Sequence, residues 1–314
     1  KNKGDKGDCN NYRGISLLSI AGKAIARVLL KRLQALAERV LPEIQCGFRA
    51  NRSTIDMIFS LRQLQEKCRE QQKPLYMAFV DLTKAFDTVS RSGLYQVLEA
   101  IGCPPTLLSL TKAFHDEMQA TVQYDGSKSD SFNIRSGVKQ GCVLAPTLFG
   151  IYFAVLLETA LGDAPGDILL HWRADGSLYK LARLKAKTKV RQATIKELLF
   201  ADDAALVTHS QEKLQNMIDK LNSTCKEFSL AISVKKTVIL PQNVPDGCEA
   251  VKLEGRPLDI VHKFCYLGST VTSKLSLDEE INGRIGKAAT SFGKLTKRAW
   301  QNKYLTTKTK LQIY

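Results

Sequence analysis

The chain has 314 residues, 44% of them hydrophobic, and carries a formal net charge of +15. A chain of this length and apolar content can bury a sizeable core, and it indicates roughly two domains or one domain with lobes. No apolar stretch approaches the roughly 18 residues of a membrane span, so we expect no membrane partner. The positive charge instead predicts a polyanionic partner.

The eight cysteines are scattered without close pairs, and a chain of this size needs no disulfide framework. We therefore expect reduced thiols in an intracellular protein, and neither disulfides nor a zinc site.

The first predicted elements are two amphipathic helices. One spans residues 19–40 and is stopped by Pro42, and the other begins near Ser53, which forms a capping pair with Asp56. The apolar residues expected on their buried sides are Ile20, Ala24, Val28, Leu29, Leu33, Leu36 and Val40 in the first helix and Ile55, Ile58, Phe59 and Leu64 in the second.

Single strands then alternate with helices. Strands are predicted at 75–80, 120–124, 132–134, 185–191, 231–232 and 238–240, and helices at 94–101, 106–114, from Pro146, and 214–228. The alternation favours an α+β or split βαβ arrangement over a sandwich or a bundle.

Two adjacent carboxylates, Asp202 and Asp203, lie between the apolar runs 198–200 and 204–207. Neighbouring side chains of a continuous strand point to opposite faces, so both acids reach one site only where the chain reverses. Asp tolerates such turns, which predicts a hairpin tip. The tip is either a metal platform or an ordinary turn.

Asp81 directly follows the apolar strand predicted at 75–80, and we expect this strand and the Asp202 hairpin to be central in one sheet. Two-metal phosphoryl chemistry needs carboxylates from separate elements, and oxygen ligands suit Mg2+ or Mn2+. The alternative role of Asp81 is a cap on residues 82–84. The basic charge of the chain favours the chemical role.

Seven sequence blocks follow one another in a specific order: NYRGISLL (11–18), QCGFR (45–49), FVDLTKAFD (79–87), GVKQGCVLAP (137–146), FADD (200–203), LAISVKKT (230–237) and FCYLG (264–268). Together they resemble the reverse transcriptases of non-LTR (LINE-type) retrotransposons, with group II intron enzymes as more distant relatives. The chain departs from the family pattern at Gly14, Ala145, Ser229 and Ser233.

The resemblance implies a right-hand polymerase with fingers, a ferredoxin-like palm and the start of a helical thumb. The implied divisions are fingers at 1–74, the first part of the palm at 75–101, a fingers–palm connection at 102–136, the palm at 137–274 and a truncated thumb at 275–314. The activity implied is RNA-directed DNA polymerisation, with an RNA template, a DNA primer and dNTPs as partners.

The resemblance also assigns roles to single residues. Asp81 and Asp202 would bind two Mg2+ ions, with Asp203 in support and the backbone C=O of Leu82 or Val80 as a further ligand. Phe86 would exclude a 2′-hydroxyl, and an ordinary core position is its alternative role. The remaining nucleotide-binding residues would be Arg13, Lys23, Gln140, Gly141 and Lys236. A solvated helix position is the alternative role of Lys23.

Primer and template contacts are expected at the block 264–268 and in the basic tail. From residue 282 onwards there are eight basic residues and no acidic one, a pattern that favours phosphate contacts over a merely solvated helix face. Lys185 to Arg191 would add a basic strand face. The residues predicted to contact primer or template are Arg49, Tyr266, Leu267, Gly268, Arg284, Lys294, Lys297 and Arg298, and a structural contact is the alternative role of Arg49.

Two other functions are open from the sequence. One is an RNA-templated RNA polymerase, against which Phe86 argues, and the other is a degenerate retroelement remnant that binds nucleic acid without catalysis. The chain begins without Met and ends within a basic helical pattern, so we expect an excised core. By resemblance it would act in the nucleus.

Overall fold

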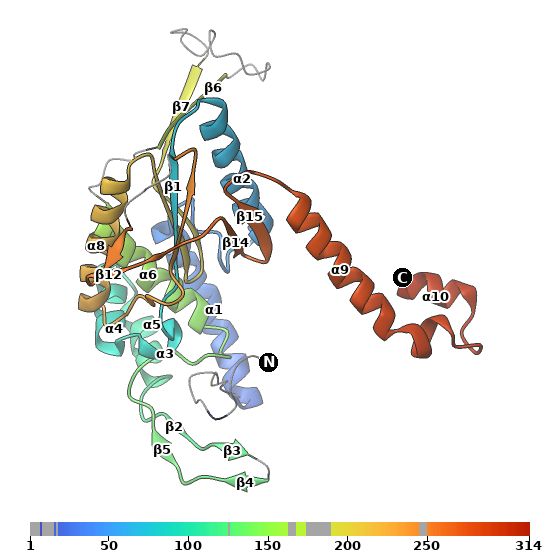
Figure 1. The fold of residues 1–314 in the computed structure, drawn as a ribbon. Helices are drawn as coiled ribbons and strands as arrows, with labels where there is room; N and C mark the ends of the chain where they lie inside the picture. Colours follow the sequence, from blue (N-terminus) through green and yellow to red (C-terminus); the bar gives the residue numbers. More distant parts are fainter. Residues whose placement is uncertain are drawn as a thin grey trace. The chain divides into compact units, whose positions relative to one another are not determined.

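The computed structural model, drawn in Figure 1, describes residues 7, 16, 18–124, 126–162, 168–173, 190–244 and 250–314. The chain forms two compact units, Lys1–Val261 and His262–Tyr314. Both are built from helices and strands, which confirms the predicted α+β class. The first block of the resemblance, including Arg13, lies almost wholly outside the described residues, as do residues 185–189.

The larger unit is built on a five-stranded sheet with the strand order β13-β10-β1-β9-β8. Its strands are β1 (Leu75–Val80), β8 (Glu197–Phe200), β9 (Asp203–Thr208), β10 (Val238–Gln242) and β13 (Asp259–Ile260). The predicted strand at 75–80 is confirmed, and β1 lies centrally, antiparallel to both β9 and β10. The hairpin of β8 and β9 is less central than expected, because β8 is the edge strand.

Helices cover both faces of this sheet. Figure 1 draws α6 and α8 on one side of β1 and α2 on the other. α8 packs on β1 and β9, and α6 packs on α8, α1 and α4. The helices of the larger unit are α1 (Ile20–Val40), α2 (Thr54–Glu70), α3 (Ala85–Thr88), α4 (Arg91–Ala100), α5 (Pro105–Ala113), α6 (Ala145–Leu161) and α8 (Gln211–Glu227).

Short hairpins complete the larger unit. They pair β2 (Gln119–Ala120) with β5 (Phe132–Asn133), β3 (Gln123–Tyr124) with β4 (Ser127–Lys128), β6 (Ile168–Arg173) with β7 (Val190–Ile195), and β11 (Lys252–Leu253) with β12 (Arg256–Pro257). The strands predicted on either side of residues 125 and 126 are therefore confirmed. The strand predicted at 231–232 is wrong, since Ile232 makes only an isolated bridge with Leu82.

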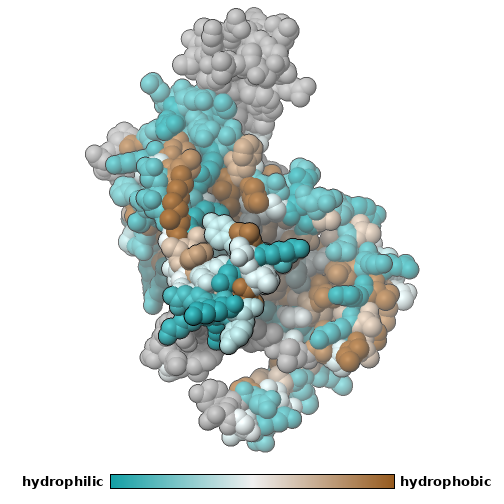
Figure 2. Space-filling model, turned by 90° about the vertical axis from the view of Figure 1, so that its right-hand side faces the viewer, coloured by the Kyte–Doolittle hydropathy of each residue, from teal (hydrophilic) through white to brown (hydrophobic). Residues whose placement is uncertain are grey.

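The predicted helix faces need correction. Ile20 and Val28 of α1 and Ile55 and Phe59 of α2 are exposed. Apolar periodicity marks a face of a helix, but the neighbours that cover it come from tertiary packing. Figure 2 shows hydrophobic residues gathered in several patches on one face of the molecule. Among the described residues, no helix combines the length and the apolar character that crossing a bilayer requires.

The smaller unit contains the hairpin of β14 (Lys263–Tyr266) and β15 (Ser269–Thr272), followed by α9 (Asp278–Lys294), the π-helical turn η2 (Thr296–Trp300) and α10 (Thr307–Ile313). Glu280 of α9 accepts a hydrogen bond of 2.6 Å from the Thr270 N–H of β15. This bond and the pairing with Arg284 lower the pKa of Glu280 to about 2. The carboxylate thus ties α9 to the hairpin.

Candidate active site

Three predicted acids lie at one end of the five-stranded sheet, where β1 ends and β9 begins. Val80, the last residue of β1, pairs with Ala204 of β9, so the next residues outwards are Asp81 and Asp203. Because the strands are antiparallel neighbours, these two residues occupy facing positions where both strands end. Asp202 precedes Asp203 in the turn. The backbone therefore brings together acids that are far apart in the sequence.

The predicted hairpin tip is confirmed. Phe200 pairs with Asp203, so Ala201 and Asp202 form a two-residue turn between β8 and β9. The left-handed backbone conformation falls on Ala201, with φ at 59°, rather than on either acid. Ala has a Cβ that makes this conformation unfavourable, so the turn requires support from its surroundings.

Asp81 is held by the segment that precedes β10. Its C=O accepts a hydrogen bond of 2.8 Å from the N–H of Ser233, and its side-chain Oδ1 lies 3.0 Å from the Lys236 ammonium. The neighbouring N–H of Thr83 bonds to the Ala231 carbonyl. Successive residues of a strand present their backbone groups to opposite sides, so the C=O of Leu82 faces the side of β9.

Phe86 and the loop of residues 137–141 pack against each other. The Val138 N–H donates to the Phe86 carbonyl at 2.8 Å, and the Phe86 ring stacks on Phe149 of α6 with centroids 4.7 Å apart. Gly137 has φ at 80°, and a Cβ there would lie 2.6 Å from the carbonyl oxygen of Asp87. Glycine is therefore required for this close approach.

The other predicted nucleotide-binding residues lie on separate parts of the larger unit. Gln140 is half-buried, and its carbonyl accepts a 2.7 Å hydrogen bond from the Ser16 N–H. Gly141 is exposed with φ at 108°. Lys23 is exposed on α1.

Arg91 is a residue of this region that the sequence analysis missed. At the start of α4 it donates to three backbone carbonyls, those of Gly137 (3.1 Å), Ser136 (3.2 Å) and His115 (2.8 Å). It thereby fixes the start of the 137–141 loop. A lone Arg after a helix cap gives no sequence signal for such a role.

Arg49 makes structural contacts, as the alternative interpretation expected. Its guanidinium pairs with Glu38 at 2.6 Å and donates to the carbonyls of Pro42 and Gln45. The hydrogen bond with Arg49 lowers the pKa of Glu38. The residue braces the chain between α1 and α2.

The predicted primer-contacting block is a tight turn of the smaller unit. Leu267 and Gly268 connect β14 to β15 with φ values of 46° and 87°, and Tyr266 is buried. Arg284 pairs with Glu280. Lys294, Lys297 and Arg298 are exposed.

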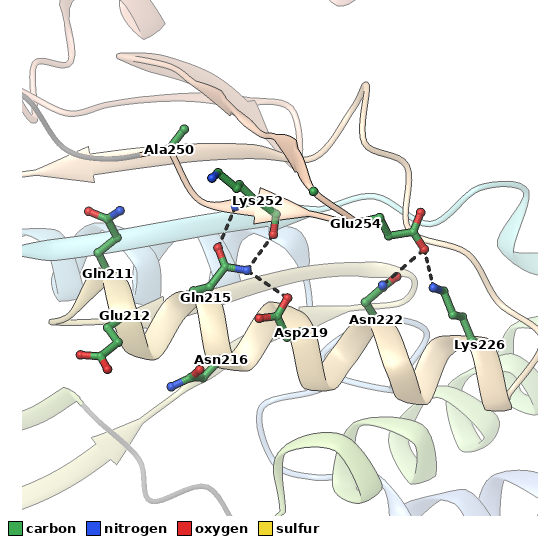
Figure 3. Close-up of a pocket in the computed structure, with 11 residues that line it drawn as sticks. Gln211, Glu212, Gln215, Asn216, Asp219, Asn222, Lys226, Ala250, Lys252 and Glu254 are labelled. Carbon is green, nitrogen blue, oxygen red and sulfur yellow. Dashed lines mark hydrogen bonds and ion pairs between the residues drawn. The ribbon is translucent and has the colours of Figure 1, made fainter.

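A cavity of about 940 Å3 lies along α8 (Figure 3), and its lining among the described residues does not include the three acids. Several of its polar groups bind one another. Gln215 bonds to Asp219 and to the backbone of Lys252, and Glu254 pairs with Lys226 at 2.6 Å. These contacts attach β11 and β12 to α8, so we do not assign the active site there.

A sheet of this order, with acids where two neighbouring strands end, fits the palm of a right-hand polymerase. The family model described as reverse transcriptase (RNA-dependent DNA polymerase) matches residues 1–271. The chain belongs to this reverse transcriptase family.

Curated relatives of this chain support the family assignment. The chain is 27% identical to the RNA-directed DNA polymerase from mobile element jockey of Drosophila melanogaster, over 87% of this chain and 28% of the relative. It is 28% identical to the Pol polyprotein from the type-1 retrotransposable element R2 of Popillia japonica, over 75% of this chain and 30% of the relative. The chain thus spans less than a third of these curated relatives.

The fold is also similar to that of a solved structure, the apo telomerase from Candida tropicalis truncated from its C-terminal domain. The TM-score is 0.52 at 15% identity, and the match covers 80% of this chain and 44% of the telomerase. This likeness confirms the right-hand fold.

Enzymes of this family use divalent metal ions, and the donor chemistry at the sheet edge fits them. Carboxylate oxygens are the ligands that hard divalent cations prefer. In the described ranges, no three His, Cys, Asp or Glu side chains are gathered as a preformed metal site. Like charges repel, so we expect acids at one edge to converge only around a cation. The Lys236 ammonium already provides a positive charge at Asp81.

Proposed function

We propose that this chain is the polymerase core of a retrotransposon protein that copies an RNA template into DNA, adding dNTPs to a DNA primer. The observation that carries the proposal is the strand register, which puts the backbone of Asp81 opposite Asp203, next to the turn that contains Asp202, at one end of the palm sheet. Family membership supports the type of reaction. Insertion into chromosomal DNA would place this activity in the nucleus.

We propose that Asp81 and Asp202 bind two Mg2+ ions, which Mn2+ can replace, with support from Asp203 and the C=O of Leu82. When bound, such ions stabilise the charge on the attacking and leaving oxygens of phosphoryl transfer. Lys236 supplies a further positive charge at this edge, since its ammonium is within 3.0 Å of Asp81. It is a candidate proton donor to the leaving pyrophosphate.

The remaining residues orient the substrates. Phe86 leaves no space for a ribose 2′-hydroxyl, while Gln140 and Gly141 line the incoming nucleotide. Arg13 and Lys23 bind its triphosphate. In the smaller unit, Tyr266, Leu267 and Gly268 position the primer end. The basic residues that bind primer or template phosphates are Arg284, Lys294, Lys297 and Arg298.

Extension of oligo(dT) on poly(rA) with dTTP and Mg2+ tests the proposal. We expect extension by the unaltered chain, its loss on chelation of the metal, and a fall of at least about 100-fold for Asp202→Asn. Asp219→Asn is the matched control, since this acid lies on α8 and bonds to Gln215. A chain that binds the duplex without extending it would contradict the proposed activity. Extension that survives Asp202→Asn would contradict the metal assignment.

A further inference from the structure

The turn that carries Asp202 is clamped by a buried side chain from another part of the chain. Gln45, between α1 and α2, is 1% exposed. Its amide Nε2 donates to the carbonyl of Ala201 at 3.2 Å, and its Oε1 accepts from the N–H of Ala201 at 2.9 Å. One side-chain amide therefore binds both backbone polar groups of the residue before Asp202.

These bonds satisfy groups that are otherwise costly. Ala201 is buried and has φ at 59°. A buried backbone group without a partner is costly, and so is a left-handed conformation at a residue that has a Cβ. The amide of Gln45 stabilises the strained conformation, because it matches the N–H and the C=O that this conformation presents.

The backbone beside Gln45 is fixed against the same hairpin. The Cys46 N–H donates to the Leu199 carbonyl at 3.0 Å, and residues 45 and 199 form a parallel bridge along the edge strand β8. A Cβ at Gly47 would lie 2.1 Å from the Ala201 nitrogen. Only glycine permits this approach, and the Gly47 N–H also donates to Gln45 Oε1 at 2.8 Å.

We propose that Gln45 is a positioning residue for the polymerase reaction: it sets the direction of Asp202 by holding the Ala201 turn. This inference rests on the proposed function, since it assigns Asp202 to the reacting site. Gln45 itself acts only through Ala201. The clamp couples the segment between α1 and α2 to the acids of the palm.

The test compares Gln45→Met with Gln65→Met. Gln65 is also 1% exposed, and its amide donates to Gln242. Both substitutions therefore remove a buried amide of the same size, but Gln65 does not contact the turn. Gln45→Glu, measured at a pH where its carboxyl is ionised, is the second variant should Gln45→Met fail to fold, because the carboxylate keeps the shape and the acceptor oxygen and has no donor for Ala201.

Two readouts are measured for each variant. We expect Gln45→Met to lower kcat about 100-fold, as for a misplacement of about 1 Å, while the Kd for primer–template stays within about twofold. Amide hydrogen exchange in the peptide around residues 199–203 should rise at least about tenfold without any metal or substrate. Gln65→Met should leave both quantities close to those of the unaltered chain.

Several results would overturn the inference. They are unchanged exchange at the turn in Gln45→Met, faster exchange with full kcat, or equal losses of kcat in the two Met variants. If the unaltered chain proves inactive, the proposed function fails. The exchange comparison then still decides whether Gln45 holds the turn.

Discussion

At the scale of single residues, the packing of Phe86 supports the selective role that we propose for it. Its ring stacks on Phe149, and its carbonyl accepts from Val138 in the 137–141 loop. The ring is therefore fixed on one side by α6 while the residue remains half-buried. A rigid ring is what a steric filter requires, since a mobile one would yield to an extra hydroxyl.

We expect Phe86→Val to admit ribonucleotides, because the smaller side chain leaves space beside the sugar. The ratio of kcat/KM for dTTP to that for UTP should fall at least about tenfold, which corresponds to about 1.4 kcal/mol of discrimination. Single-nucleotide addition on poly(rA) measures both values. Phe86→Tyr keeps the ring and should keep the ratio. Unchanged discrimination in Phe86→Val would leave Phe86 as a core residue only.

At the scale of elements, strand β8 contains a buried acid that makes the hairpin sensitive to pH. Glu197 is 6% exposed, and burial raises its pKa from 4.5 to about 7. The folded state therefore favours the protonated acid. The contribution of protonated Glu197 to the stability of the folded state is fully present below pH 4.5. It is lost progressively as the pH rises through about 7.

We expect Glu197→Gln to stabilise the chain at high pH, since the neutral amide avoids a buried charge. A pKa shift of this size corresponds to at most about 3 kcal/mol at pH 8, with little effect near pH 4. Urea unfolding at the two pH values measures the difference. Glu212→Gln, at an exposed position of α8, is the control. An equal effect of Glu197→Gln at both pH values would exclude titration as the cause.

Local sequence signals predicted where helices and strands occur better than they predicted which face of a helix is buried. Ser53 and Asp56 form the predicted cap, with the Ser53 N–H bonded to Asp56 at 2.7 Å. Caps and apolar runs act over a few residues, so the sequence displays them directly. The exposure of Ile55 and Phe59 depends on which elements pack nearby, and no local pattern encodes that.

The same distinction applies to the candidate site. The placement of Asp81 and Asp202 could be predicted because each lies at the end of an apolar run and both fall within a known series of blocks. Gln45 lies in one of those blocks, yet its contact with Ala201 joins positions that only the folded chain brings together. The same holds for Arg91 and the loop at Gly137.

At the scale of the whole molecule, the net charge of +15 does not show how many basic side chains can contact a nucleic acid. Arg49 and Arg91 are engaged by an acid or by backbone carbonyls within the chain. A guanidinium already bonded in this way contributes less to phosphate binding, since contact with phosphate would break its internal bonds. The exposed cations of the smaller unit are therefore better candidates for the salt-dependent part of binding.

We expect the triple variant Lys294→Gln, Lys297→Gln and Arg298→Gln to bind an RNA–DNA duplex less tightly. The affinity of this variant should also depend less on salt concentration. Each phosphate contact that is lost lowers the slope of log K against log salt concentration by about 0.9. The slope should therefore fall by about 2 to 3, as measured by fluorescence anisotropy across a salt series. Lys226→Gln is the control, since Lys226 pairs with Glu254 on α8. An unchanged slope in the triple variant would show that the duplex does not contact this part of the smaller unit.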